Sequence, residues 1–275
     1  MRMAITGANG QLGQALQQVF GQRHEVIALT RAELNIEQSS SVDTLAASGA
    51  DLVLHPAAYT NVDGCARDPE RAVRANTLGT KHVALACRRL RAPLVYISTN
   101  EVFDGASDRA YFEYDRPNPI NAYGQSKWGG EQVVRELLDE FYIARVAWLY
   151  GGERNFVRTV LRLAAERPEL SMVADEVGTP TSVHDVAPAL ERLIKTGHYG
   201  IFHIVNEGAC SRYEFARQAL QLAGKGDYPL RAITLADFKR DSVVPPHTPL
   251  RNTAAAVLGI TLRPWQEALA AFIGT

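Results

Sequence analysis

The sequence has few cysteines and almost no net charge. Its three cysteines, Cys65, Cys87 and Cys210, are too few for a disulfide framework and lack the CxxC spacing of zinc sites. The seven histidines show no HxH or HxxxH pairing, so we expect no metal site. A formal net charge of −1 argues against nucleic acid or a membrane surface as a partner.

A long apolar run is also missing. The first residues, MRMAIT, lead directly into a glycine turn, and no segment has the length of a signal peptide core or a membrane span. With 46% apolar and 21% charged residues in 275, the composition is that of a soluble globular protein. We therefore expect a cytoplasmic protein with one large domain, or a large domain with a smaller companion.

Short apolar runs alternate with amphipathic stretches through the first two hundred residues. The apolar runs predict buried strands at 1–5, 25–29, 51–55, 93–98, 142–149 and 200–205. The amphipathic stretches predict helices at about 11–21, 41–48, 69–91, 121–139 and 183–196. Such alternation is typical of the α/β class, and it predicts a Rossmann-type, doubly wound parallel sheet with helices on both faces.

The pattern changes near residue 207 to helices and loops rich in proline. We predict that residues 1–150 and about 182–206 form an NAD(P)-binding domain. Residues of about 151–181 and 207–275 would form a smaller C-terminal substrate lobe. In doubly wound proteins such a lobe lies over the carboxyl ends of the strands, where ligands bind.

A glycine-rich turn joins the first predicted strand to the first predicted helix. In AITGANGQLGQAL, Gly7 suits a tight turn, Gly10 lets the backbone approach a pyrophosphate, and Gly13 allows close helix–strand packing. The helix N-terminus offers backbone N–H groups to phosphates. We therefore predict dinucleotide binding by this turn, including its residues Asn9, Gln11 and Leu12.

The end of the second strand bears on the choice of cofactor. An acidic residue there binds the ribose of NAD, whereas an arginine accommodates the 2′-phosphate of NADP. Arg31 stands at this place, which favours NADPH, with NADH as the other possibility. Further residues that we expect beside the cofactor are Asn35, Ile36, Ala57, Ala58 and Tyr59.

Tyr123 and Lys127 occur in NAYGQSK at the start of a predicted helix, and residues four apart share a helix face. A cation beside the phenol is expected to lower its pKa from ~10 toward neutrality and make Tyr123 a proton donor. Thr99 ends the fourth strand, where its hydroxyl faces the ligand crevice. Two such donors can stabilise the oxygen of a ketone that receives a hydride.

These motifs together resemble the extended short-chain dehydrogenase/reductases, and within them most closely the dTDP-4-dehydrorhamnose reductase family. The resemblance covers nearly the whole chain, through the blocks TGANGQLG, AAYTNVD, STNEVFDG, NAYGQSK, AWLYG, NFVRTVLRLA, DEVGTPTS and FHIVNEG. It implies NADPH-dependent reduction of the C4 ketone of dTDP-4-dehydro-6-deoxy-L-mannose to dTDP-L-rhamnose. The smaller lobe would then bind the sugar nucleotide.

The resemblance also implies roles for individual residues. Thr99, Tyr123 and Lys127 would form the catalytic triad, with Tyr123 as the proton donor, Lys127 on the nicotinamide ribose and Thr99 on the carbonyl. Trp148 and Asn100, like Thr99, would bind the substrate. Asn76 is either a support of the site or an ordinary helix residue, and Trp265 is expected to anchor the C-terminal helix.

Two segments depart from the family pattern. Asn100 and Glu101 stand where the family has Asp-Tyr, and the family's late RPxxS segment reads VPPHTPLRN at 244–252. These departures keep open a 4-ketoreductase of another deoxy or amino sugar nucleotide. A non-catalytic NADP-binding regulatory subunit, like that of methionine adenosyltransferase, is a further alternative, and a homodimer is possible.

Overall fold

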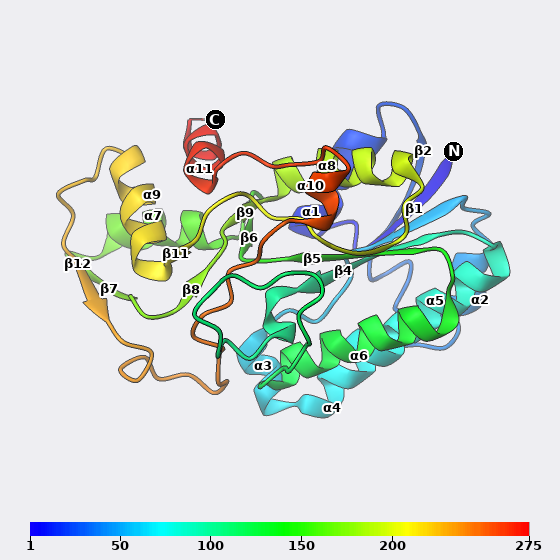
Figure 1. Ribbon diagram of the computed structural model, residues 1–275, viewed down its shortest axis with the longest axis horizontal. Helices are drawn as coiled ribbons and strands as arrows, with labels where there is room; N and C mark the ends of the chain where they lie inside the picture. Colours follow the sequence, from blue (N-terminus) through cyan, green and yellow to red (C-terminus); the bar gives the residue numbers. More distant parts are fainter. Residues whose placement is uncertain (275) are drawn as a thin grey trace.

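A six-stranded parallel sheet forms the centre of the computed structural model, which describes residues 1–274 (Figure 1). Its strands, in spatial order, are β2 (Glu25–Leu29), β1 (Arg2–Thr6), β3 (Leu52–His55), β4 (Leu94–Thr99), β5 (Phe141–Val146) and β10 (Gly200–His203). Every pairing in this sheet is parallel. The chain order reverses between β1 and β3, which makes that point the switch where such sheets bind ligands.

The predicted α/β class and parallel sheet are confirmed, but one predicted strand is wrong. The apolar run 142–149 was expected to be a single strand, whereas β5 stops at Val146 and β6 (Leu149–Tyr150) pairs elsewhere, with β9 (Thr181–Ser182). The break falls at Trp148, whose φ of 43° lies in the left-handed region. A turn of this kind cannot be read from an apolar run.

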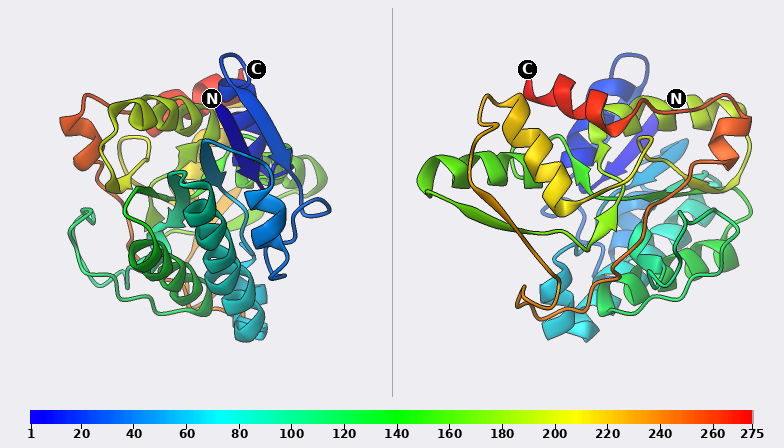
Figure 2. Two further views of the ribbon diagram at one scale, coloured as in Figure 1. Left: turned by 90° about the vertical axis from the view of Figure 1, so that its right-hand side faces the viewer. Right: turned by 60° about the vertical axis from the view of Figure 1, so that its left-hand side comes forward.

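Helices cover both faces of the sheet (Figure 2). On one face α1 (Gln11–Phe20) packs beside α8 (Val183–Thr196), and their apolar side chains meet those of β1, β3 and β5. On the other face lie α2 (Ser41–Ala46), α5 (Gly79–Leu90) and α6 (Ala122–Leu137). Strands buried on both faces explain the nearly continuous apolar runs in the sequence.

The helix predicted at 69–91 contains an unusual segment. It consists of α4 (Pro69–Ala72), a π-helical segment η1 (Val73–Leu78) and α5. Wide turns of this type re-aim side chains and occur often at functional sites. Here the π segment carries the buried Asn76.

The remaining elements gather mainly beyond the carboxyl ends of β4 and β5, at the left of Figure 1. The larger ones are α7 (Phe156–Glu166), β7 (Leu170–Val173), α9 (Arg212–Leu222), β12 (Leu230–Ile233) and α11 (Trp265–Ile273). Shorter ones along the chain are α3 (Val62–Arg67), η2 (Asn100–Val102), β8 (Val177–Gly178), β11 (Cys210–Ser211) and α10 (Ala254–Val257).

Two apolar clusters lie among these elements and are separate from the sheet cores. Trp265 is buried in one of them against Phe215, so it anchors the C-terminal helix as expected. Not all of the C-terminal part lies in this region, because Ala255 and Ile260, which precede Trp265 in the chain, pack into the core between the sheet and α8. No helix within residues 1–274 is long and apolar enough to cross a membrane.

Candidate active site

One cavity of about 630 Å³ opens at the carboxyl ends of the central strands. All the cofactor, catalytic and substrate residues predicted from the sequence line it: Gly7, Asn9, Gly10, Gln11, Leu12, Gly13, Arg31, Asn35, Ile36, Ala57, Ala58, Tyr59, Thr99, Asn100, Tyr123, Lys127 and Trp148. They come from loops after five different strands, and the parallel sheet brings these loops to one edge.

The glycine turn has the geometry of a phosphate-binding loop. Gly7 has a φ of 61°, and a Cβ there would lie 2.8 Å from the backbone of Ala57. Only glycine fits this contact without displacing the end of β3. Gly10 is the N-cap of α1 and has no side chain to satisfy the first N–H groups of that helix. Those groups remain available to an anion in the cavity.

The cavity wall after β2 carries a pair of opposite charges. Arg31 Nη2 lies 2.8 Å from Glu37 Oε1, and both side chains line the cavity. Arg31 is the cation that the sequence placed at the 2′-phosphate position, and its side chain is 68% exposed. Glu37 was not predicted from the sequence. It lies six residues after Arg31, and the turn between them brings its carboxylate back to the guanidinium group.

Asn76 connects the loop after β3 with the helix that carries Tyr123 and Lys127. Its Oδ1 accepts from the backbone N–H of Tyr59 at 2.7 Å, and its Nδ2 donates to Ser126 Oγ at 2.9 Å. The side chain is 1% exposed, so these hydrogen bonds are shielded from water. Of the two interpretations given above, the support of the site agrees with this geometry.

The N-terminus of α6 is fixed against the turn after β4. Asn121 caps the helix by accepting from the backbone N–H of Gly124 at 2.8 Å. A Cβ on Gly124 would lie 2.0 Å from the carbonyl oxygen of Glu101, so the absence of a side chain lets the two segments touch. This contact places Tyr123 beside Thr99, whose hydroxyl is near enough to lower the pKa of Tyr123.

The expected effect of Lys127 on Tyr123 is wrong. Burial, and next the charge of Glu101, raise the pKa of Tyr123 above its usual value, while the hydrogen bond to Thr99 lowers it. Lys127 does not oppose this, because burial lowers its own pKa to about 7. Its Nζ donates to the carbonyl oxygen of Ile97 at 2.6 Å and lies 4.1 Å from the centre of the Tyr96 ring. The burial of Tyr123 and Lys127, rather than their position on one helix face, is the largest cause of these pKa shifts.

A buried ion pair lies next to Lys127. Arg145 of β5 contacts Glu131 of α6 through two hydrogen bonds of 2.9 and 2.7 Å, and their side chains are 1% and 0% exposed. Ser98 Oγ donates to the same carboxylate at 2.5 Å. The charge of Glu131 raises the pKa of Lys127 and opposes the effect of burial.

The two segments that depart from the family pattern lie together. Asn100 Nδ2 donates to Thr248 Oγ1 at 2.7 Å, and Asn121 Nδ2 donates to the carbonyl oxygen of Val243 at 2.9 Å. Asn100 lines the cavity, as predicted, but its amide already has a hydrogen-bond partner, Thr248, from the 244–252 segment. The two departing segments are therefore in direct contact through the hydrogen bond between Asn100 and Thr248.

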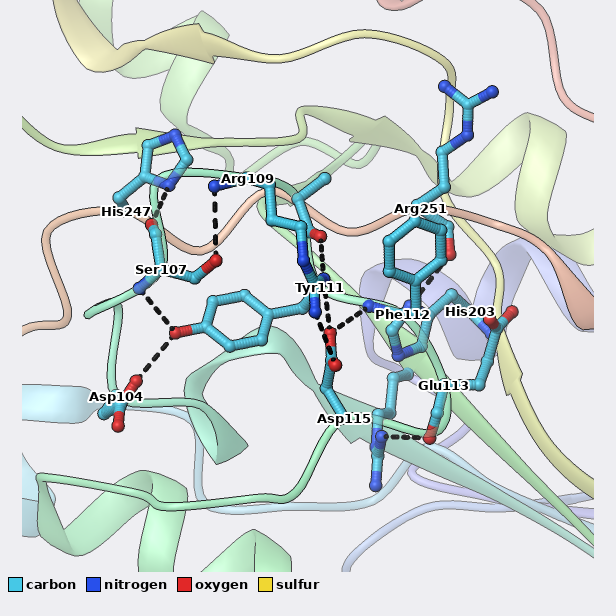
Figure 3. A network of polar contacts seen from close by, with 12 residues as sticks. Asp104, Ser107, Arg109, Tyr111, Phe112, Glu113, Asp115, His203, His247 and Arg251 are labelled. Carbon is cyan, nitrogen blue, oxygen red and sulfur yellow. Dashed lines mark hydrogen bonds and ion pairs between the residues drawn. The ribbon is translucent and has the colours of Figure 1, made fainter.

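Backbone and side-chain hydrogen bonds extend this contact along the loop after β4 (Figure 3). The backbone N–H of Tyr111 donates to the carbonyl oxygen of Pro249 at 2.8 Å. The backbone N–H of Arg251 donates to the carbonyl oxygen of Tyr111, also at 2.8 Å. His247 Nδ1 donates to the carbonyl oxygen of Ser107 at 2.8 Å. These bonds hold residues 107–111 of the loop after β4 against the C-terminal segment.

Trp148 meets a residue that sequence reasoning missed. The guanidinium group of Arg212 lies 3.5 Å from the centre of the Trp148 ring, and Arg212 also lines the cavity. Arg212 forms an ion pair with Glu176 at 3.0 Å. It is the first residue of α9 and lies inside the Ser211–Glu214 capping box, a pattern that marks a helix start but not its position over the cavity.

Comparisons with known proteins agree with this geometry. The family model described as RmlD substrate binding domain matches residues 1–275. The dTDP-4-dehydrorhamnose reductase of Mycolicibacterium smegmatis is 38% identical over 98% of this chain and 84% of that protein. A spore coat polysaccharide biosynthesis protein of Bacillus subtilis is 36% identical over 99% of this chain and 96% of the relative.

A solved structure is similar to this chain over its whole length. The dTDP-4-dehydrorhamnose reductase of Bacillus anthracis, in complex with NADP, superimposes with a TM-score of 0.96 at 37% identity, covering 100% of this chain and 99% of that one. The agreement extends over the sheet, the cavity loops and the C-terminal elements. This chain therefore belongs to the dTDP-4-dehydrorhamnose reductase family of the extended short-chain dehydrogenase/reductases.

Proposed function

We propose that the protein reduces the C4 ketone of dTDP-4-dehydro-6-deoxy-L-mannose to dTDP-L-rhamnose with NADPH. One observation carries the proposal: Thr99, Tyr123 and Lys127 meet the glycine turn in one cavity. Relatives at 36–38% identity that carry the name dTDP-4-dehydrorhamnose reductase, and a neighbour in complex with NADP, support it. Because its pKa is raised, Tyr123 carries its proton before the ketone is reduced.

The residues present fit a nicotinamide dinucleotide. The open N–H groups of α1 and the close approach permitted at Gly10 suit its pyrophosphate, and Arg31 suits the 2′-phosphate. NADPH, when bound, supplies the hydride for reduction. Glu37 pairs with Arg31 and could accept from a free 2′-hydroxyl, which keeps NADH as an alternative. NADH is the weaker one because a similar solved reductase is in complex with NADP.

In this proposal Tyr123 donates its proton to the C4 oxygen, and the hydroxyl of Thr99 donates a hydrogen bond to the same oxygen. Together they stabilise the negative charge that develops there. Lys127 holds the nicotinamide ribose and keeps a positive charge near the reacting atoms. Trp148 forms a wall of the sugar pocket together with Arg212.

We also propose the division into an NAD(P)-binding domain (1–150 and 182–206) and a sugar-nucleotide lobe (151–181 and 207–275), with a cytoplasmic location and a homodimer as further predictions. A second function, reduction of another deoxy or amino sugar nucleotide, is favoured by Asn100 and Glu101. The regulatory-subunit alternative predicts NADP binding without turnover.

The test is NADPH oxidation by the purified protein, with the dTDP-4-keto-6-deoxy-L-sugar generated in situ and NADH assayed in parallel. We expect rapid oxidation and formation of dTDP-L-rhamnose. Tight NADPH binding without turnover of this ketone would reject the proposed substrate. Turnover of related ketones would then distinguish another reductase from a regulatory subunit.

A further inference from the structure

Glu101 lies where a substrate-binding side chain is needed, although nothing in the proposed mechanism uses it. Glu101 follows Thr99 by two residues, and its backbone N–H donates to Thr99 Oγ1 at 3.2 Å. Its carbonyl oxygen is the group packed against Gly124, the neighbour of Tyr123. Glu101 is thus fixed between two proposed catalytic residues, and its side chain lines the cavity.

The carboxyl group of Glu101 is only partly used by the protein. Its Oε2 accepts from Asn121 Nδ2 at 2.7 Å, whereas its Oε1 has no hydrogen-bond partner among residues 1–274. Glu101 is partly exposed, so Oε1 faces the cavity and is open to water or to a ligand. A ligand hydroxyl could supply the missing partner.

The charges around Glu101 indicate the kind of ligand group. Arg212 and Arg240 are near enough to lower the pKa of Glu101, but each already forms an ion pair, with Glu176 at 3.0 Å and with Asp63 at 3.0 Å. Neither arginine therefore needs Glu101 as a counterion. The surroundings of Glu101 therefore carry no uncompensated positive charge, and a neutral hydroxyl is a suitable hydrogen-bond partner for its carboxyl group.

The raised pKa of the Glu101 carboxyl group agrees with an uncharged hydrogen-bond partner. Burial raises the pKa of Glu101, and the charge of Glu176 raises it further, while the hydrogen bond from Asn121 lowers it. Such a group can accept from a sugar hydroxyl and, when protonated, can donate to it. A methyl group or a hydrogen atom in the same place would displace water from Oε1 without replacing its hydrogen bond.

We propose that Glu101 determines specificity by hydrogen-bonding the C3 hydroxyl of the sugar, next to the ketone that is reduced. In a 4-keto-6-deoxyhexose the carbons beside C4 are C3, which carries a hydroxyl, and C5, which carries the ring oxygen and a methyl group. When Tyr123 and Thr99 bind the C4 oxygen, C3 is the neighbouring carbon that offers a donor. This inference rests on the proposed function.

The test compares two ketones, the dTDP-4-keto-6-deoxy-L-sugar and its 3-deoxy analogue, by kcat/KM with NADPH. We expect the wild type to prefer the 3-hydroxy ketone by roughly 10- to 100-fold, since the site is left with an unpaired polar group when the hydroxyl is missing. Glu101→Ala should lose this preference because kcat/KM falls only for the 3-hydroxy ketone. Glu101→Gln, which keeps an acceptor, should retain part of it.

Glu166→Ala is the matched control, because Glu166 is an exposed carboxylate of α7 that does not line the cavity. It should leave the preference unchanged. An equal fall for both ketones in Glu101→Ala, or a wild type without preference, would overturn this proposal while leaving the reductase function intact. A wild type that reduces neither ketone would overturn the reductase function, and this proposal with it.

Discussion

Replacing Glu131 by glutamine is expected to destabilise the protein strongly and to change its pH dependence. The carboxylate is fully buried and accepts two hydrogen bonds from Arg145 and one from Ser98. Glutamine keeps the size of the side chain but removes the negative charge. The guanidinium group of Arg145, 1% exposed, would then be a buried cation without a counterion.

The magnitude follows from this loss. Removing one partner of a buried ion pair costs about 3–5 kcal/mol, mostly because the other charge stays buried and uncompensated. An exposed pair is the matched control: Arg162 and Glu166 lie 2.8 Å apart on α7, with side chains 60% and 52% exposed. Glu166→Gln should change the free energy of unfolding by no more than about 0.5 kcal/mol.

The assay is equilibrium urea unfolding followed by far-UV circular dichroism, with both variants at the same pH. A double variant, Glu131→Leu with Arg145→Met, removes both charges and should recover most of the lost stability. A loss below about 1 kcal/mol in Glu131→Gln, or a double variant no better than the single one, would refute the reasoning.

A second readout concerns Lys127, whose pKa is about 7 and is raised by the charge of Glu131. Without that charge the pKa of Lys127 falls further. If turnover requires the charged lysine, the rate should then decline at a lower pH than in the wild type. If the alkaline limb of the pH profile of kcat is the same in Glu131→Gln as in the wild type, the charge of Lys127 does not control the rate.

Three other variants test the remaining roles. Tyr123→Phe should keep its affinity for NADPH in a fluorescence titration but lose roughly 10²- to 10⁴-fold in kcat, and full activity would reject its role as proton donor. Arg31→Ala should reduce the preference for NADPH over NADH in kcat/KM by about 10-fold, because a charge-assisted contact is lost; an unchanged preference would exclude Arg31 from 2′-phosphate binding. Lys127→Met removes a group whose pKa falls from 10.5 to about 7 on folding. Between these values the unfolded wild type binds the extra proton, so its stability should rise with pH relative to Lys127→Met, and parallel unfolding curves from pH 7 to 10 would contradict the lowered pKa.

Local sequence determined much of the fold and many of the cavity residues. The glycine turn, the strand-end Thr99 and the Tyr123–Lys127 spacing could be recognised because strand alternation and the helix repeat are local properties of the chain. A parallel sheet brings strand ends to one edge, which is why residues chosen on separate strands line one cavity. Only the strand predicted at 142–149 failed for a local reason, the left-handed backbone of Trp148.

Tertiary structure decided what these residues contact and how they titrate. The Asn100–Thr248 hydrogen bond joins residues 148 positions apart, and no local pattern specifies such a pairing. Burial, rather than the four-residue spacing, set the pKa values of Tyr123 and Lys127. Desolvation depends on every atom packed around a group, so the sequence named the side chains proposed to react and only the folded chain determined their protonation.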